Sequence, residues 1–161
     1  MPETIQQNAV SPKKVVSILE PWASLIKEKV KYIETRSWST KYRGELYIHA
    51  SRKTVSAQIA TEHKIAKQAK TNYDVLLNLL HDTDFNYGCI IAKCKLVDCI
   101  YMTEEFIEKV KKNHNEYVSG VYNVGRYAWI LEDIEVITPI PAKGQLGIWE
   151  YTPAQITQKA A

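Results

Sequence analysis

The segment from residue 88 to residue 101 constrains the fold more than any other part of the sequence. It is a long, mainly apolar run that is rich in isoleucine, valine and cysteine. β-branched residues favour strands, and an apolar run bounded by turn residues is typical of a strand that is covered on both faces. We therefore predict a long, bent strand at the centre of a small β-barrel.

Shorter segments with strand or helix patterns surround this run. Strands are expected at residues 14–18, 32–36 and 45–49, and residues 127–139 form either one long strand or a pair, before a closing segment at 140–151. Helical spacing appears at 22–26, 51–70, 73–80 and 104–112. A sheet of so few strands must curl to bury its core, so the predicted class is α+β: a small β-barrel with inserted helices.

The chain length of 161 residues suits one domain with one hydrophobic core. We expect a flexible lead-in at residues 1–13, the domain at 14–152 and a tail at 153–161. The polar start fails as a secretory signal, and no apolar run reaches the roughly 20 residues that span a bilayer. The expected location is the cytoplasm, or the nucleus in a eukaryote, with no membrane association.

The cysteines and histidines do not predict a metal site. Cys89, Cys94 and Cys99 are spaced five apart, which matches neither a disulfide framework nor the paired spacing of a zinc site, and we interpret them as buried strand residues. The histidines form no cluster with acidic residues. We therefore expect no metal ion and no cofactor.

Positive charge is concentrated near the N-terminus. Residues 10–53 contain ten Lys and Arg against four Glu, a net of +6, whereas the whole chain carries only +3. Such asymmetry is typical of proteins that bind polyanions, and a basic face without a partner is an equal alternative at this point.

The segment around residues 31–36 combines charges in a pattern that suits a binding site. Strand alternation places Glu34 and Arg36 on one face, where the arginine can hold the carboxylate, and Lys31 lies close by. Lys31 could bind phosphate or act as a base if desolvated. The alternative is an exposed ladder of ion pairs with no function.

The chain resembles the ASCH (activating signal cointegrator homology) family in several motifs. These are Pro21-Trp22, Lys31-x-x-Glu34-x-Arg36-Ser-Trp38, Tyr42-Arg-Gly44, Ile48-His49-Ala50-Ser51, Arg126-Tyr-Ala-Trp129 and the glycine-containing end at 141–149. The resemblance implies a PUA-like β-barrel with a cleft beside the Lys-x-x-Glu-x-Arg strand, in a family proposed to bind RNA. One subgroup resembles amidohydrolases with a threonine nucleophile, and others are reported as nucleases. Glu34 occupies the threonine's position here, so a threonine-dependent amidohydrolase is not expected.

The leading hypothesis is a basic cleft that binds single-stranded RNA or DNA, most favourably RNA, or a nucleotide fragment. The candidate ligand-binding residues are Lys31, Glu34, Arg36, Trp38, Tyr42, Arg43, Ser51 and Arg52, with Lys53 as a further phosphate contact. Trp38 and Tyr42 offer stacking surfaces, although core packing competes for Trp38, and Trp22 and Trp129 are expected in the core. Gly144 and Gly147 flank a loop that could approach a ligand backbone closely.

The alternative hypothesis is an enzyme that uses the same cleft, either a metal-independent ribonuclease or a nucleoside hydrolase. Lys31, Tyr47, His49 and Lys53 are its candidate catalytic residues, because a His, a Tyr and a Lys near a phosphate can perform acid–base work on a 2′-hydroxyl. A purely structural His49 competes with this role. A third hypothesis is a protein partner bound by the helices of residues 51–80.

Overall fold

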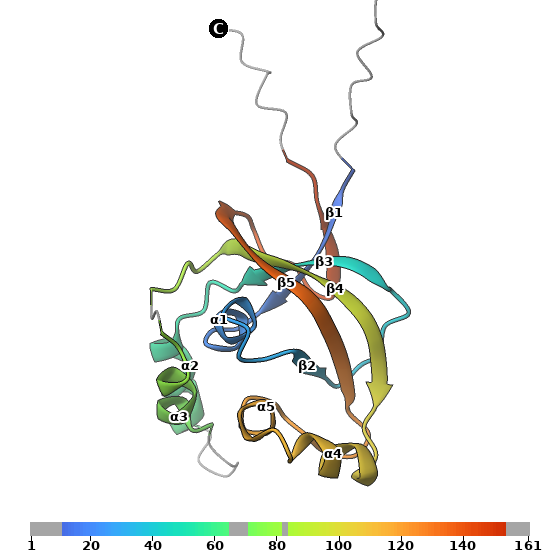
Figure 1. Ribbon diagram of the computed structural model, residues 1–161. Coiled ribbons are helices and arrows are strands. Elements are labelled where there is room, and N and C mark those ends of the chain that lie inside the picture. Colours follow the sequence, from blue (N-terminus) through green and yellow to red (C-terminus); the bar gives the residue numbers. More distant parts are fainter. Residues whose placement is uncertain (1–10, 65–70, 82–83, 154–161) are drawn as a thin grey trace, which may run out of the picture.

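The computed structural model describes residues 11–64, 71–81 and 84–153. Its strands are β1 (Lys13–Ile18), β2 (Ile33–Arg36), β3 (Gly44–Ala50), β4 (Cys89–Tyr101), β5 (Tyr127–Pro141) and β6 (Ile148–Tyr151). They form one six-stranded sheet in the order β2-β5-β4-β3-β1-β6, in which only β1 and β3 pair in parallel. The sheet curls into a half-barrel (Figure 1), which confirms the predicted α+β class with a curled sheet and inserted helices.

The long apolar run is a central strand, as predicted. β4 pairs with β3 on one side and with β5 on the other, and register shifts along both ladders let these long strands bend. Ile90, Ile91 and Ala92 are all buried, so both faces of β4 are covered there. The open question about residues 127–139 is also answered, because β5 is a single strand of 15 residues.

The cysteines lie on this strand and are all free. Cys94 is buried, whereas Cys89 and Cys99 are half-buried, so burial is complete for only one of the three. Burial raises the pKa of the Cys94 thiol to about 12. Its side chain therefore serves the core as a small apolar group.

Five helices connect and cover the strands: α1 (Trp22–Lys27), α2 (Val55–Lys64), α3 (Tyr73–Asn78), α4 (Glu104–Val110) and α5 (His114–Val118). α1 lies on the concave side of the sheet, α2 and α3 lie together at one end, and α4 and α5 lie at the other (Figure 1). The prediction missed α5, and residues 65–70 of the predicted second helix lie outside the described residues. No helix in the described ranges is both long and apolar enough to span a bilayer.

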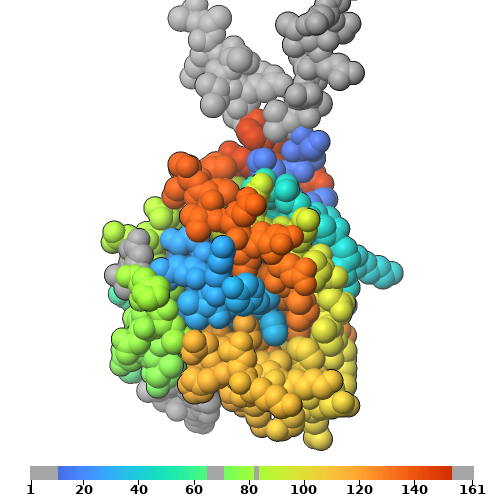
Figure 2. All heavy atoms as spheres, viewed as in Figure 1, coloured from blue at the N-terminus to red at the C-terminus, as the bar shows by residue number. Residues whose placement is uncertain are grey.

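The core fills the curl of the sheet. Trp129 of β5 is fully buried among Ile26 of α1 and Leu46 and Ile48 of β3, as expected for a core tryptophan. Figure 2 shows the segment of α1 and β2 (blue) at the centre of one face, between the α2–α3 region (green) and the α4–α5 region (gold). β2 therefore pairs with β5 and lies between the two helical regions. This arrangement fixes the positions of its side chains.

A buried carboxyl group lies at the start of α1. Glu20 is fully buried, and its Oε1 accepts a 2.7 Å hydrogen bond from the Ser24 backbone N–H. Burial raises the pKa of this carboxyl above its ordinary value of 4.5, against the lowering effects of the Ser24 hydrogen bonds and of Lys27. The folded state therefore holds this proton more tightly than the unfolded state.

The Glu20→Gln variant should remove a pH dependence of stability. From pH 4.5 up to the raised folded pKa, the folded state binds more protons than the unfolded state, so the free energy of unfolding falls as pH rises. Glutamine keeps an acceptor for Ser24 but has no proton to lose. Urea unfolding across this pH range should show a shallower fall for Glu20→Gln than for the parent, with exposed Glu105→Gln as the control. Identical profiles for Glu20→Gln and the parent would contradict a raised pKa of the Glu20 carboxyl in the folded state.

Candidate functional site

Two adjoining pockets lie at the end of the sheet where β1, β2 and β3 meet. The first, here called the β2 pocket, has a volume of about 350 Å³ and is lined by Ser17, Ile18, Leu19, Trp22, Glu34, Thr35, Arg36, Ser37, Trp38, Gly120, Val121 and Arg126. The second, the loop pocket, has a volume of about 470 Å³ and is lined by Ser17, Arg36, His49, Ser51, Arg52 and residues 143–147. Ser17 and Arg36 line both pockets, which makes the pockets immediate neighbours.

Glu34 and Arg36 project together from β2, as strand alternation predicted. Glu34 is only 7% exposed, and its Oε1 accepts a 2.9 Å hydrogen bond from Thr35 N. Arg36 places Nη2 at 3.5 Å from Glu34 Oε2 and donates from the same nitrogen to Ser17 O at 2.8 Å. Its buried Nε has no hydrogen-bond partner in the described part of the chain. The pair is therefore half-buried in a pocket wall, which does not fit an exposed ion-pair ladder.

On the loop-pocket side, a hydrogen-bonded group fixes His49. The indole of Trp149 donates to Ser17 Oγ at 3.0 Å, and this hydroxyl lies 3.1 Å from His49 Nδ1. His49 Nε2 lies 2.8 Å from Ala142 O, and because a carbonyl only accepts, Nε2 carries the proton and donates. Both ring nitrogens are engaged and the residue is 1% exposed, which supports the structural role for His49.

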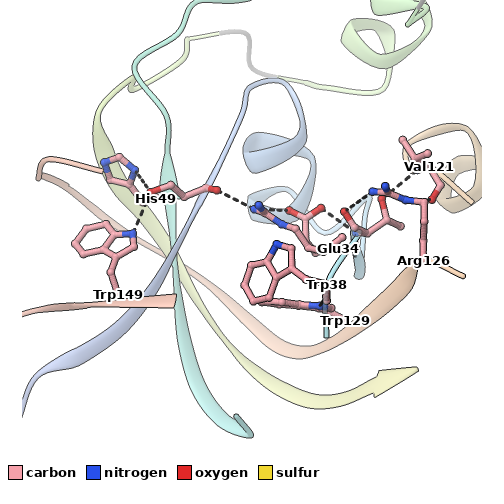
Figure 3. A network of polar contacts seen from close by, with 10 residues as sticks. Glu34, Trp38, His49, Val121, Arg126, Trp129 and Trp149 are labelled. Carbon is pink, nitrogen blue, oxygen red and sulfur yellow. Dashed lines mark hydrogen bonds and ion pairs between the residues drawn. The ribbon is translucent and has the colours of Figure 1, made fainter. Parts of the chain in front are cut away.

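On the β2-pocket side, the chain of contacts continues to the segment before β5 (Figure 3). Val121 N donates to Thr35 Oγ1 at 3.1 Å, and Arg126 Nη2 donates to Thr35 O at 3.4 Å. Arg126 Nε also donates to Val121 O at 3.2 Å. Polar contacts thus run from Trp149 to Val121 along the walls of both pockets, which holds the two pockets in a fixed relation.

Trp38 serves the pocket and the core together. Its ring packs edge-to-face on Trp129, with centroids 4.8 Å apart, and its carbonyl accepts from Trp129 Nε1 at 3.4 Å. The side chain is still 36% exposed and lines the β2 pocket. Trp22, expected in the core, packs against Tyr73 but also lines this pocket. The β2 pocket therefore offers aromatic surface beside a carboxylate and two arginines.

Lys31 is completely buried behind β2 and lines neither pocket. Its Nζ has no hydrogen-bond partner among the described residues, and burial lowers the pKa of its ammonium group while Glu34 and Glu116 oppose that shift. The Tyr122 hydroxyl is also buried without a described partner, and burial, followed by Glu116 and Glu34, raises the pKa of its phenol. Lys31 thus does not contact a pocket ligand from this position.

Glu116 of α5 is the buried residue that sequence reasoning missed. Its two carboxylate oxygens accept 2.9 Å hydrogen bonds from the backbone N–H groups of Tyr32 and Ile33 at the start of β2. It is 3% exposed. No local pattern links α5 to a strand so far away in the sequence, so only the fold reveals that Glu116 anchors β2.

The other predicted residues divide between the loop pocket and positions outside both pockets. Ser51 and Arg52 line the loop pocket, as does Lys143, which the prediction missed. Arg36, Arg52 and Lys143 give this pocket three cationic side chains, and none of its lining residues in the described part of the chain carries a carboxylate. The Arg52 stem is supported by Gly88, where an added Cβ would lie 3.0 Å from Arg52 Cγ. This arrangement suits an anion.

Tyr42, Arg43, Tyr47 and Lys53 line neither pocket. The Tyr42 hydroxyl donates to Glu45 O, and Arg43 donates to Thr40 O at 2.9 Å and lies 3.6 Å from Asp98. Tyr47 is 6% exposed and packs with Val15, Ile90 and Trp149, while Lys53 is exposed. Of the four candidate catalytic side chains, Lys31, Tyr47, His49 and Lys53, only His49 lines a pocket, so the structure does not bring them together in one.

A family model agrees with the motifs that line these pockets. The ASCH domain model matches residues 16–141, which is most of the chain. This chain belongs to the ASCH domain family. Activating signal cointegrator 1 from Homo sapiens and from Mus musculus are each 28% identical to it over 138 residues, which is 84% of this ASCH domain and 22% of each relative. The chain thus spans about a fifth of the length of these curated relatives.

Two solved structures of ASCH from Zymomonas mobilis also resemble this ASCH domain. Both have a TM-score of 0.48, with 14% identity for the parent protein and 15% for a point mutant. The matches cover 80% of this chain and 73% and 75% of the two others. Within the described part of this ASCH domain, no group of three or more His, Cys, Asp or Glu side chains is arranged to hold a metal ion.

Proposed function

We propose that this ASCH domain binds single-stranded nucleic acid, RNA most favourably, with a base in the β2 pocket and the adjoining phosphate in the loop pocket. The observation that carries the proposal is that two pockets of different chemistry lie side by side and share Arg36 as a lining residue. The β2 pocket combines tryptophan surface with the Glu34 carboxylate, whereas the described residues that line the loop pocket include cationic side chains and no carboxylate. Nucleic acid presents these same two chemistries, a flat polar-edged base and an anionic backbone.

The base pocket has groups that suit the edge and the face of a base. Glu34 Oε2 can accept from an exocyclic amine, and the exposed part of the Arg36 guanidinium can donate to a ring nitrogen or carbonyl. Trp38, which is rigid because it packs on Trp129, offers a stacking surface. Stacking of one base on an aromatic ring contributes about 1–3 kcal/mol. RNA is favoured over DNA because the ASCH family is associated with RNA binding.

The ribonuclease and nucleoside hydrolase alternatives have weaker support. Acid–base cleavage of RNA needs a side chain that can exchange a proton with the 2′-hydroxyl, and His49 has both ring nitrogens engaged. Tyr47 and Lys53 lie outside the pockets, and Lys31 is buried behind Glu34. We therefore propose a binding module and not an enzyme.

Salt dependence of binding tests the proposal. Fluorescence anisotropy of a labelled single-stranded RNA octamer should show binding that weakens with salt. One phosphate neutralised in the loop pocket gives a slope of about −0.7 in log K against log salt concentration, since each neutralised phosphate of a single strand contributes about that amount. DNA of the same sequence should bind more weakly. An affinity that does not change with salt would contradict a phosphate site in the loop pocket.

A further inference from the structure

Leu146 is a fully exposed leucine at the edge of a cationic pocket. Its side chain is 99% exposed, whereas the next most exposed large hydrophobic residue of the described chain, Val136, is 62% exposed. Single exposed leucines are common on protein surfaces and need no explanation by themselves. The position of this one is informative, because Leu146 lines the loop pocket together with Arg36, Arg52 and Lys143.

The loop that carries Leu146 is anchored where it leaves β5. Ala142 N donates to Gly88 O at 3.0 Å, and Ala142 O accepts from His49. Gly144 then passes so close to the wall of the pocket that an added Cβ would lie 2.9 Å from His49 Cε1 and 3.1 Å from Ser17 Oγ. The residues before Leu146 are therefore held in place, and the Leu146 side chain projects into solvent.

The combination of an apolar side chain and three cations selects the chemistry of the occupant. The cations attract a phosphate. The leucine side chain contributes to the binding free energy only if it is buried against apolar surface directly beside that phosphate. A nucleotide supplies both, because the face of its base adjoins its phosphate. Apolar side chains, leucine among them, pack against base faces in nucleic-acid complexes.

We propose that Leu146 packs against a second nucleotide, next to the one whose base occupies the β2 pocket, so that the smallest full ligand is a dinucleotide. The linking phosphate then lies at Arg36, Arg52 and Lys143. The shared wall of the two pockets supports this order, because a strand that leaves the β2 pocket past Arg36 enters the loop pocket directly. This inference rests on the proposed function and adds the length of strand that the site recognises.

Competition binding tests the inference. A dinucleoside monophosphate and a mononucleotide with the same base would each displace a labelled single-stranded RNA octamer from the parent protein and from Leu146→Ala. The parent should prefer the dinucleotide by about tenfold, which corresponds to partial burial of a leucine side chain. The preference should fall to near one in Leu146→Ala. Leu146→Trp should keep it, and Val136→Ala, which changes an exposed side chain outside both pockets, should leave it unchanged.

The possible results separate the inference from the proposed function. If the octamer binds and Leu146→Ala keeps the parent's preference for the dinucleotide, the contact is absent and only the inference fails. If the parent does not bind the octamer, both fail. Displacement of the octamer by a glutamate-rich peptide as readily as by the dinucleotide would identify an acidic protein segment as the occupant and overturn the inference.

Discussion

Replacing Glu116 with alanine should lower the free energy of unfolding by about 3 kcal/mol, the largest stability loss we expect from a single residue near the site. The change leaves the half-buried N–H groups of Tyr32 and Ile33 without their acceptor, and a donor left without a partner costs about 1–3 kcal/mol when it is buried. It also removes a negative charge that favours the buried Lys31 ammonium group. Urea denaturation followed by circular dichroism would measure the loss.

Two companion variants make this result interpretable. Glu108→Ala removes an exposed carboxylate that pairs with Lys111 at 2.7 Å, and should cost less than about 1 kcal/mol. Glu116→Gln keeps one acceptor oxygen and should fall between the parent and Glu116→Ala. If Glu116→Ala is as stable as Glu108→Ala, Glu116 does not anchor β2.

Arg36→Ala should weaken RNA binding by about 10- to 100-fold, because among the described residues Arg36 is the one cationic side chain that lines both pockets. A charge-assisted hydrogen bond contributes about 1.5–3 kcal/mol, which corresponds to this range. Arg36→Lys keeps the charge but loses the planar fork, and should recover only part of the affinity. Anisotropy with the RNA octamer would measure all three proteins.

Lys95→Ala is the matched control for Arg36→Ala. Lys95 lies on β4 outside both pockets, and its Nζ forms an exposed ion pair with Asp133 at 3.4 Å. Because Arg36 also contacts Ser17 O and Glu34, circular dichroism must show that Arg36→Ala is folded. Equal losses for Arg36→Ala and Lys95→Ala would mean that overall charge, and not the site, binds RNA.

The long central strand and the α+β class could be predicted because their signals are local. The same holds for strand faces. Strand alternation over residues 45–49 predicts that Leu46 and Ile48 lie on the face opposite Tyr47 and His49. In the structure Leu46 and Ile48 pack in the main core, and Tyr47 packs with Trp149. Alternation does not reveal that β6 and its preceding loop cover the second face. Tyr47 and His49 are therefore buried, although both were candidate catalytic residues of the cleft.

The composition of the candidate site could be predicted only where its residues share one motif. Glu34, Arg36 and Trp38 lie within five positions and reach the β2 pocket together. Lys31 belongs to the same motif but is buried, and Glu116, the acidic residue of α5 that favours its charged form, comes from a part of the chain with no local relation to β2. Lys143 and Leu146 reach the loop pocket through the β5–β6 connection, which is also a tertiary effect.

The most direct test of the account is to map where RNA touches the protein. An NMR titration of ¹⁵N-labelled protein with a single-stranded RNA octamer would follow every backbone amide. We expect shifted signals to concentrate at residues 17–19, 34–38, 49, 51–52, 120–121 and 143–147, which line the two pockets. Shifts confined to α2 and α3, or to the exposed β4 side around Lys93 and Lys95, would contradict it.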